Sequence, residues 1–170
     1  MAKRHHERSR SIAASPSEVF AFVDDHARFS SHMSESSWMM GGGRMSVEID
    51  QAKGQAVGSH IRLSGRAFGL RLFLDEVVTR REPPFLKVWE TVGTPRLLVI
   101  GAYTMGIEIT PRGSGSELRV FIDYELPNSW PSSWLGRLFG DVYARWCVTQ
   151  MLAGSARLLG AHARAASPAL

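Results

Sequence analysis

The sequence predicts an α+β domain in which a curved, seven-stranded antiparallel sheet wraps around a long C-terminal helix. Three observations lead to this prediction. Residues 131–162 have the apolar period of a helix, residues 43–126 contain six alternating segments separated by short turns, and one strand and two short helices precede them. A long helix with aromatic side chains on its apolar side needs a broad apolar surface, and one face of such a sheet supplies it.

The N-terminal elements follow from local signals. Alternation over residues 8–14 predicts the first strand. Ser15 and Glu18 have the spacing of a capping box, and Pro16 suits a first helical position, so a helix is expected over 16–24. The polar residues 24–26 predict a turn, followed by a second short helix over 27–33.

Residues 34–43 form the least regular segment. Trp38, Met39 and Met40 are followed by three glycines, 41–43, which predict a flexible loop leading into the sheet. Exposed Trp and Met side chains beside a hinge suit a gate at the lip of an apolar pocket. Alternatively, Trp38 plugs the end of the core, and the sequence leaves both interpretations open.

The middle of the chain reads as a meander of antiparallel strands. Alternating apolar and polar residues predict strands over 45–50, 59–68, 70–81, 85–92, 97–111 and 118–125. Turns are expected at residues 82–84, 93–95 and 112–115, where Pro and Gly are concentrated.

The predicted long helix has a continuous apolar stripe. Its members recur at three- and four-residue spacing: Trp134, Leu135, Leu138, Phe139, Val142, Tyr143, Trp146, Cys147, Met151 and Leu152. We expect this stripe to cover the apolar face of the sheet.

The amino-acid composition indicates the general class of protein. The chain has 170 residues, of which 44% are hydrophobic and 21% are charged, so we predict one globular domain over 1–170. The net charge is +4, and the first ten residues hold four basic residues and one acidic residue, or +3 of that total. We therefore predict a mobile basic tail over 1–7, a loose C-terminus over 163–170, and no specific nucleic-acid partner.

Other sequence features indicate the cellular location and the kinds of site to expect. The N-terminus lacks the apolar region of a secretory signal, and no apolar run is long enough for a transmembrane segment. The single cysteine, Cys147, excludes an internal disulfide and suits a reducing compartment, so we expect a cytoplasmic protein. The sequence contains no phosphate-binding glycine motif, no paired-Cys or His-x-x-x-His spacing and no Gly-x-Ser-x-Gly elbow, so neither a metal nor a cofactor is predicted.

Several segments carry a family resemblance: residues 12–20, Phe22-Val23-Asp24, Gly58-Ser59, and residues 77–84 followed by Trp89-Glu90. Over about residues 8–162 the chain resembles the START/Bet v 1-like (SRPBCC) superfamily, and more narrowly its polyketide cyclase/dehydrase and lipid transport group. The resemblance implies a helix-grip fold with a cavity between sheet and helix. Members bind lipids, sterols, hormones or polyketides there, and some cyclise or dehydrate them. These motifs are structural rather than catalytic.

Alternation along the strands, the apolar side chains of the loop over 34–43 and the apolar stripe of the long helix indicate which side chains line such a cavity. The predicted ligand-binding residues are Trp38, Met40, Leu72, Leu74, Trp89, Tyr103, Met105, Ile107, Ile122, Tyr124, Tyr143 and Trp146. A pocket with so few polar groups favours binding or transport of a hydrophobic small molecule, such as a lipid, a polyketide or an aromatic metabolite.

Two alternatives stay open on the sequence. A polyketide cyclase or dehydratase would use Tyr103 and Tyr124 as proton donors and His60 or Glu90 as base. Against it, Ile61 and Leu63 oppose His60 along the strand, which favours a solvated outer face for that histidine. In the other alternative, the basic tail binds an anionic partner. The sequence also leaves a homodimer open.

Overall fold

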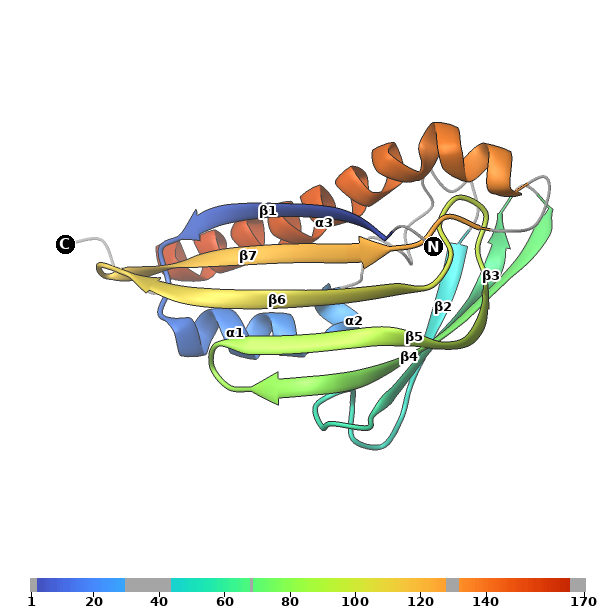
Figure 1. Cartoon of the computed structure of the whole chain (residues 1–170). Coiled ribbons are helices and arrows are strands. Elements are labelled where there is room, and N and C mark those ends of the chain that lie inside the picture. The colour runs from blue at the N-terminus through green and yellow to red at the C-terminus, as the bar shows by residue number, and fades with distance from the viewer. Residues whose placement is uncertain (1–2, 30–43, 68, 128–131, 166–170) are drawn as a thin grey trace.

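The computed structural model describes residues 3–29, 44–67, 69–127 and 132–165 (Figure 1). The elements in chain order are β1 (Arg4–Ile12), α1 (Pro16–Asp24), α2 (His26–Phe29), β2 (Arg44–Ile49), β3 (His60–Ala67), β4 (Leu70–Glu82), β5 (Leu86–Arg96), β6 (Tyr103–Arg112), β7 (Gly115–Tyr124) and α3 (Ser132–Ala165). The α+β class and the order of elements predicted from the sequence are confirmed.

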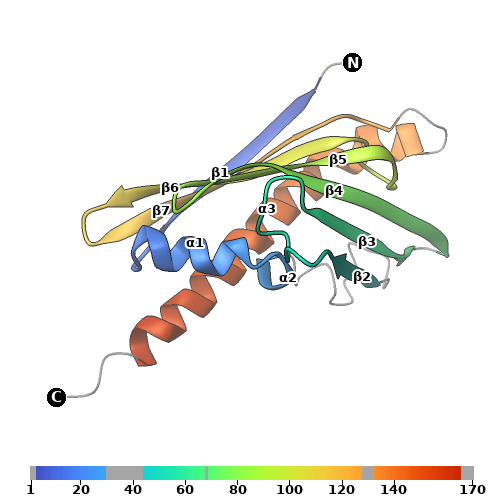
Figure 2. The ribbon, with the colours of Figure 1, turned by 90° about the horizontal axis from the view of Figure 1, so that it is seen from below.

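The strands form one seven-stranded sheet in the order β1-β7-β6-β5-β4-β3-β2. Every neighbouring pair is antiparallel, so β2 to β7 form a meander and β1 returns to pair with β7. Figure 2 shows α1, α2 and α3 on the same side of the strongly bent sheet. The helices therefore cover the concave face, as a helix-grip fold requires.

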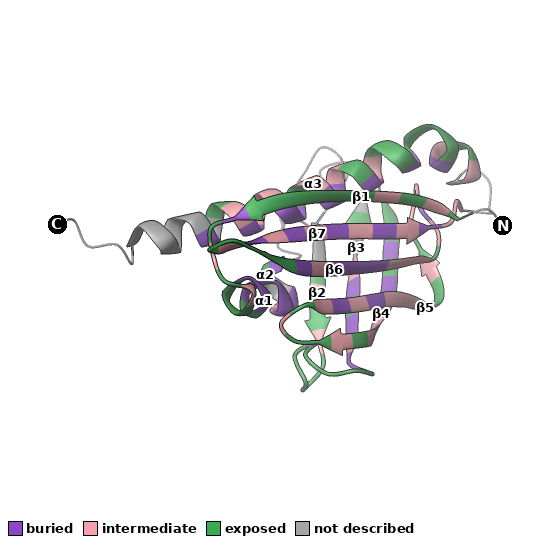
Figure 3. Ribbon diagram, turned by 60° about the vertical axis from the view of Figure 1, so that its left-hand side comes forward, coloured by how far each residue is buried: buried purple, intermediate pink, exposed green. Residues whose placement is uncertain are grey.

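The core lies between this concave face and the helices. Along β7, Leu118, Val120, Ile122 and Tyr124 are buried, and the residues between them are half-buried (Figure 3). This period of two is the pattern of a sheet with one covered face.

The predicted mobile tail over 1–7 is wrong for residues 4–7, because β1 begins at Arg4 rather than at residue 8. The charges there have partners far along the chain. Arg4 pairs with Asp141 of α3 at 2.9 Å, and His5 contacts Asp123 of β7 at 2.8 Å. Residues 163–165 likewise continue α3, whereas 166–170 lie outside the described residues.

The capping box confirms the start of α1. The Ser15 side chain accepts a hydrogen bond from the Glu18 amide, and the Glu18 carboxylate accepts one from the Ser15 amide at 2.8 Å. The second helix begins at His26, one residue earlier than predicted, and residues 30–33 lie outside the described part of the chain.

The junction of β5 and β6 differs from the prediction. Residues 93–95 do not turn, because β5 continues through them and pairs with β4 as far as Arg96. The next strand begins at Tyr103 rather than at residue 97, and its pairing with β5 ends at Glu90 and Thr104. Beyond that point β5 has β4 as its only partner strand among the described residues, so the β5–β6 side of the sheet is open there.

The first half of α3 presents a different face to the core than predicted. Trp134, Leu138, Phe139 and Val142 are exposed, at 59%, 53%, 48% and 51% respectively. The buried side instead carries small residues. A Cβ on Gly136 would lie 2.6 Å from Cδ of Pro127, so the absence of a side chain allows the β7–α3 connection to approach the helix closely.

A buried ionic cluster joins the end of α1 to the sheet. Lys87 of β5 is fully buried and donates hydrogen bonds to the Asp24 backbone carbonyl at 2.9 Å and to its carboxylate at 3.0 Å. Arg81 of β4 donates to the same carboxylate at 2.8 Å. Burial lowers the pKa of the Lys87 ammonium, and the Asp24 charge partly opposes that change. Burial also acts to raise the pKa of Asp24, but the bonds and charges of Arg81 and Lys87 outweigh it and lower that pKa.

Candidate functional site

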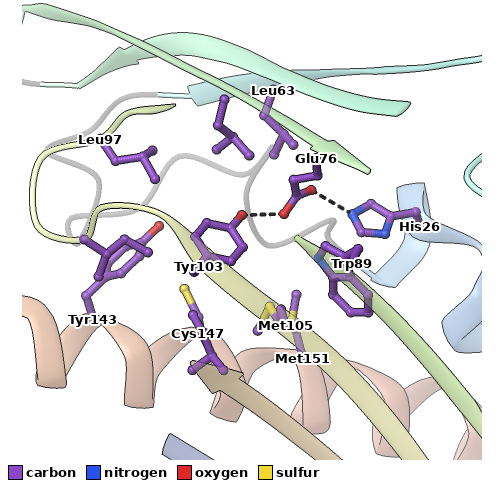
Figure 4. Close-up of a pocket in the computed structure, with 13 residues that line it drawn as sticks. His26, Leu63, Glu76, Trp89, Leu97, Tyr103, Met105, Tyr143, Cys147 and Met151 are labelled. Carbon is purple, nitrogen blue, oxygen red and sulfur yellow. Dashed lines mark hydrogen bonds and ion pairs between the residues drawn. The ribbon is translucent and has the colours of Figure 1, made fainter. Parts of the chain in front are cut away.

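A small cavity lies between the concave face of the sheet and α3 (Figure 4). Its volume is about 40 Å³, enough for a few water molecules and far below the ~300–1,000 Å³ of typical ligand pockets. The described residues that line it are His26, Leu63, Leu74, Glu76, Trp89, Leu97, Ile100, Tyr103, Met105, Ile122, Tyr143, Cys147 and Met151. Most of these are apolar or aromatic.

Three polar side chains from different elements meet inside this cavity. Glu76 projects from β4, Tyr103 from the start of β6 and His26 from the start of α2 (Figure 4). The Tyr103 hydroxyl donates a hydrogen bond to Oε1 of Glu76, and Nε2 of His26 lies 3.5 Å from Oε2 of the same carboxylate. We call these residues the polar trio. They can donate to or accept from one polar group of a ligand.

The surroundings of the trio are largely buried and aromatic. The side chains of His26 and Glu76 are 2% and 4% exposed. The rings of His26 and Trp89 meet edge-to-face, with centroids 5.2 Å apart. Burial, followed by the negative charge of Glu76 and the hydrogen bond to it, holds the pKa of the Tyr103 phenol well above its usual value. Tyr103 therefore keeps its proton and acts as a donor at neutral pH.

The α3 wall adds Tyr143 and Cys147. Burial raises the pKa of the Tyr143 phenol well above its usual value, and the neighbouring Cys147 raises it further. Burial also raises the pKa of Cys147 to about 12, although a hydrogen bond with Tyr143 partly opposes that rise. The thiol is therefore a packing group rather than a nucleophile.

This environment predicts that Cys147 is protected from alkylation in the folded protein. At about pH 8, modification by iodoacetamide should be on the order of a thousandfold slower than in the unfolded chain, since the thiol pKa moves from 9.0 to about 12. Intact mass measured over time, with and without denaturant, gives both rates, and the chain has no other cysteine. Similar rates in the two states would contradict the placement of Cys147.

A larger opening adjoins the cavity where β5 has separated from β6. We call it the mouth groove. Its volume is about 670 Å³, and it is lined by residues 70–72 of β4, 93–98, 100–102 and 125–127. Leu97 and Ile100 line both the cavity and the mouth groove. These two side chains form the boundary between the cavity and the mouth groove.

Comparison with known proteins identifies the family. Residues 3–164 match the family model described as polyketide cyclase / dehydrase and lipid transport. The chain belongs to this family. None of the curated proteins matches the sequence.

Several solved structures share the fold. Norcoclaurine synthase from Thalictrum flavum, in complex with dopamine and hydroxybenzaldehyde, is 15% identical with a TM-score of 0.66, over 95% of this chain and 88% of that chain. A Thermus thermophilus protein is 17% identical with a TM-score of 0.66, over 96% and 100%. Ara h 8.0201 is 10% identical with a TM-score of 0.61, over 94% and 99%. These similarities establish the Bet v 1-like helix-grip fold.

In this polyketide cyclase/dehydrase family member, the structure brings only part of the predicted ligand-binding set together. The members of that set that line the cavity are Leu74, Trp89, Tyr103, Met105, Ile122 and Tyr143. Leu72 lines the mouth groove instead. Trp38 and Met40, with the predicted gate over 38–43, lie outside the described residues.

Other predicted residues lie elsewhere. Ile107 is fully buried but does not line the cavity. Trp146 is half-buried and packs its ring 5.8 Å from that of Tyr143. The Tyr124 ring is buried, but its hydroxyl donates to Asp141 on the side of α3 that faces β1, so it is not available as a proton donor in the cavity. Burial, followed by the bond to Asp141, raises the Tyr124 pKa to about 12.

Neither predicted base reaches the cavity. His60 contacts Asp75 at 2.9 Å and is 41% exposed. Glu90 follows the buried Trp89 and therefore points to the opposite face of β5. The cavity supplies Glu76 and His26 in their place, which sequence reasoning missed. Glu76 carried a signal, since it has the same strand parity as Leu72 and Leu74.

Two further findings concern the described residues alone. None of their helices is long and apolar enough to cross a membrane. No group of three or more His, Cys, Asp or Glu side chains among them is arranged to hold a metal ion.

Proposed function

We propose that the protein binds a hydrophobic small molecule between the sheet and α3, with its polar group against Glu76, Tyr103 and His26. The observation that carries this proposal is the convergence of three polar side chains in an otherwise apolar cavity, with His26 and Glu76 buried and Tyr103 half-buried. Binding sites in proteins typically combine an apolar lining with a few such groups. Family membership supports the same role.

The small volume of the cavity constrains how a ligand lies. A lipid, polyketide or aromatic metabolite is larger than about 40 Å³. Its polar end therefore lies at the trio, and its remainder passes Leu97 and Ile100 into the mouth groove. The single cysteine suits a cytoplasmic location, which is part of this proposal. A homodimer stays a prediction.

A cyclase or dehydratase is the second candidate, and the trio is the observation that favours it. A buried carboxyl group beside an imidazole and a phenol can accept a proton from, and return one to, a bound carbonyl compound. In that case Glu76 or His26 acts as the base and Tyr103 as the donor. Norcoclaurine synthase, an enzyme of the same fold, binds two small aromatic compounds.

Native mass spectrometry of the purified protein, followed by solvent extraction, tests the binding role. We expect a hydrophobic compound bound near one per chain, or uptake of the neutral dye N-phenyl-1-naphthylamine with a fluorescence increase. Leu97→Trp should abolish either signal, because it blocks the boundary between the cavity and the mouth groove. Absence of any adduct and of dye uptake would overturn the proposal.

The Glu76→Gln variant then separates carrier from enzyme. It keeps the shape of the side chain but removes its charge and its basicity. In an enzyme, turnover of the extracted compound should fall by roughly a hundredfold or more while binding persists. In a carrier, no turnover exists to lose, and only affinity for the polar ligand changes. Glu108→Gln, a partly exposed position on β6, is the control.

A further inference from the structure

A row of arginines lies on the outer face of the sheet beside the mouth groove. Arg66 of β3 is the direct cross-strand partner of Arg71 of β4, so their side chains project from the same face. Arg96 of β5 is the partner of Phe73, two residues from Arg71 on that same face. Like charges directly opposite each other destabilise a sheet. The fold therefore keeps an unfavourable arrangement at this place.

These residues line a defined groove of about 610 Å³, which we call the arginine groove. Its described lining residues are Ser46, Ser64, Gly65, Arg66, Arg71, Leu72, Phe73 and Arg96. None of these described residues is a carboxylate. Over the described ranges, none of the three guanidiniums has an ion-pair partner, whereas Arg62 on the same strand pairs with Asp75 at 3.3 Å.

The arginine groove continues into the mouth groove. Arg71, Leu72 and Arg96 line both hollows. Leu97 and Ile100 in turn connect the mouth groove to the cavity. The charged groups along this path are three arginines at the outer end, Glu125 in the mouth groove and Glu76 at the inner end.

We propose that the bound molecule is an amphiphile with an anionic head, which the three arginines hold while the apolar body enters through the mouth groove. The inference rests on the proposed function. It adds the chemical class of the ligand and the orientation in which the ligand lies along the path from the arginine groove to the cavity. An anionic head is attracted at the outer end and repelled by the carboxyl group of Glu76 at the inner end. The body that reaches the polar trio therefore ends in an uncharged hydrogen-bonding group. Carboxylate, sulfonate and phosphate heads share the chemistry that arginine forks recognise.

Two dyes with one skeleton test this inference. 1-Anilinonaphthalene-8-sulfonate is N-phenyl-1-naphthylamine with one added sulfonate. Fluorescence titration should give an affinity for the sulfonate dye that is roughly tenfold higher, as expected for charge-assisted hydrogen bonds, and this advantage should shrink with added salt. The triple variant Arg66→Gln/Arg71→Gln/Arg96→Gln should remove the advantage, so that the affinity for the sulfonate dye falls to that for the neutral dye in the same variant.

Matched controls test whether a general change in charge or a loss of folding could explain the result. Arg80→Gln removes one positive charge from β4 away from the groove and should change neither affinity. The triple variant relieves like-charge repulsion, so its thermal midpoint should not fall. If the triple variant does not fold, the single variant Arg71→Gln takes its place, with an expected loss of about threefold for the sulfonate dye.

The outcomes separate the two proposals. Two results would overturn the anionic-head inference: equal affinity for the two dyes, or a sulfonate advantage that survives the arginine substitutions. In either case the proposal of binding in the cavity still holds if Leu97→Trp abolishes uptake of the neutral dye. If Leu97→Trp spares the binding of the sulfonate dye, the arginines bind anions on their own and the spanning amphiphile is wrong. Competition by dodecanol, dodecanoate and dodecyl phosphate against the neutral dye then ranks the head groups.

Discussion

Asp24→Ala is expected to lower the free energy of unfolding by about 3–5 kcal/mol, because it leaves Lys87 buried without a counter-charge. The Lys87 side chain is fully buried and that of Asp24 is 6% exposed, so water cannot replace the lost partner. Arg81, whose side chain is 27% exposed, can reach solvent, so the loss of its partner destabilises the fold less. Denaturant unfolding of the variant and the wild type measures the difference.

A double variant separates the contribution of the Asp24–Lys87 charge pair from that of the packing around it. Asp24→Leu/Lys87→Met replaces the pair by apolar groups of similar volume, and such replacements are often neutral or stabilising. We expect it to recover most of the stability that Asp24→Ala loses. An equally large loss in the double variant would indicate that the contribution comes from packing at the end of α1 rather than from the charge pair.

The same cluster makes the wild type sensitive to acid. The pKa of Asp24 is lower in the folded protein than its usual 3.8, so the stability that it contributes is complete above about pH 4. That contribution is lost as the pH falls through the folded-state pKa. The double variant lacks the carboxylate and should lose less stability over the same acid range.

The sequence was most informative where the determining contacts are local. Ser15, Pro16 and Glu18 specify the start of α1 among themselves, and the predicted bounds of that helix are those observed. The start of β1 was misplaced because the partners of Arg4 and His5 lie more than one hundred residues away. Without those partners, the same residues have the composition of a free basic tail.

The periodicity of α3 predicted a helix but could not orient it. Apolar residues occupy nearly its whole circumference in the first half, so the stripe alone does not determine which side is buried. The structure buries the side that carries Gly136 and Gly140, since the chain around Val99 and Pro127 approaches closely there. That choice depends on the path of residues 97–102, which were predicted as strand and are not.

The candidate site was predicted in outline. Trp89, Tyr103 and Met105, which were predicted to bind the ligand, line the cavity, and their role in binding stays a prediction. Glu76 shares the strand parity of Leu74, and Lys87 that of Trp89, but neither was predicted to face inward. A charged residue at an inward position of a strand is a signal of buried pairing or function. Their partners could not be predicted, because His26 and Asp24 come from the helical segment and meet the sheet only in the folded structure.

Trp89→Ala is expected to cost about 3–5 kcal/mol of stability and, at the same time, to increase the capacity of the cavity. The indole is 1% exposed and packs edge-to-face against His26 and Phe29, with centroids at 5.2 Å and 6.1 Å. Its removal leaves space next to the polar trio, and apolar cavities of this kind bind small apolar molecules. Affinity for N-phenyl-1-naphthylamine should therefore rise while the thermal midpoint falls.

The exposed Trp134→Ala variant is the matched control. At 59% exposure it should change stability by no more than about 0.5 kcal/mol and leave dye affinity unchanged. If Trp89→Ala proves too unstable, Trp89→Leu makes the same test with a smaller cavity. A loss of stability without a gain in dye binding would contradict the view that Trp89 limits the cavity. The limit on ligand size would then lie at Leu97 and Ile100, where the cavity meets the mouth groove.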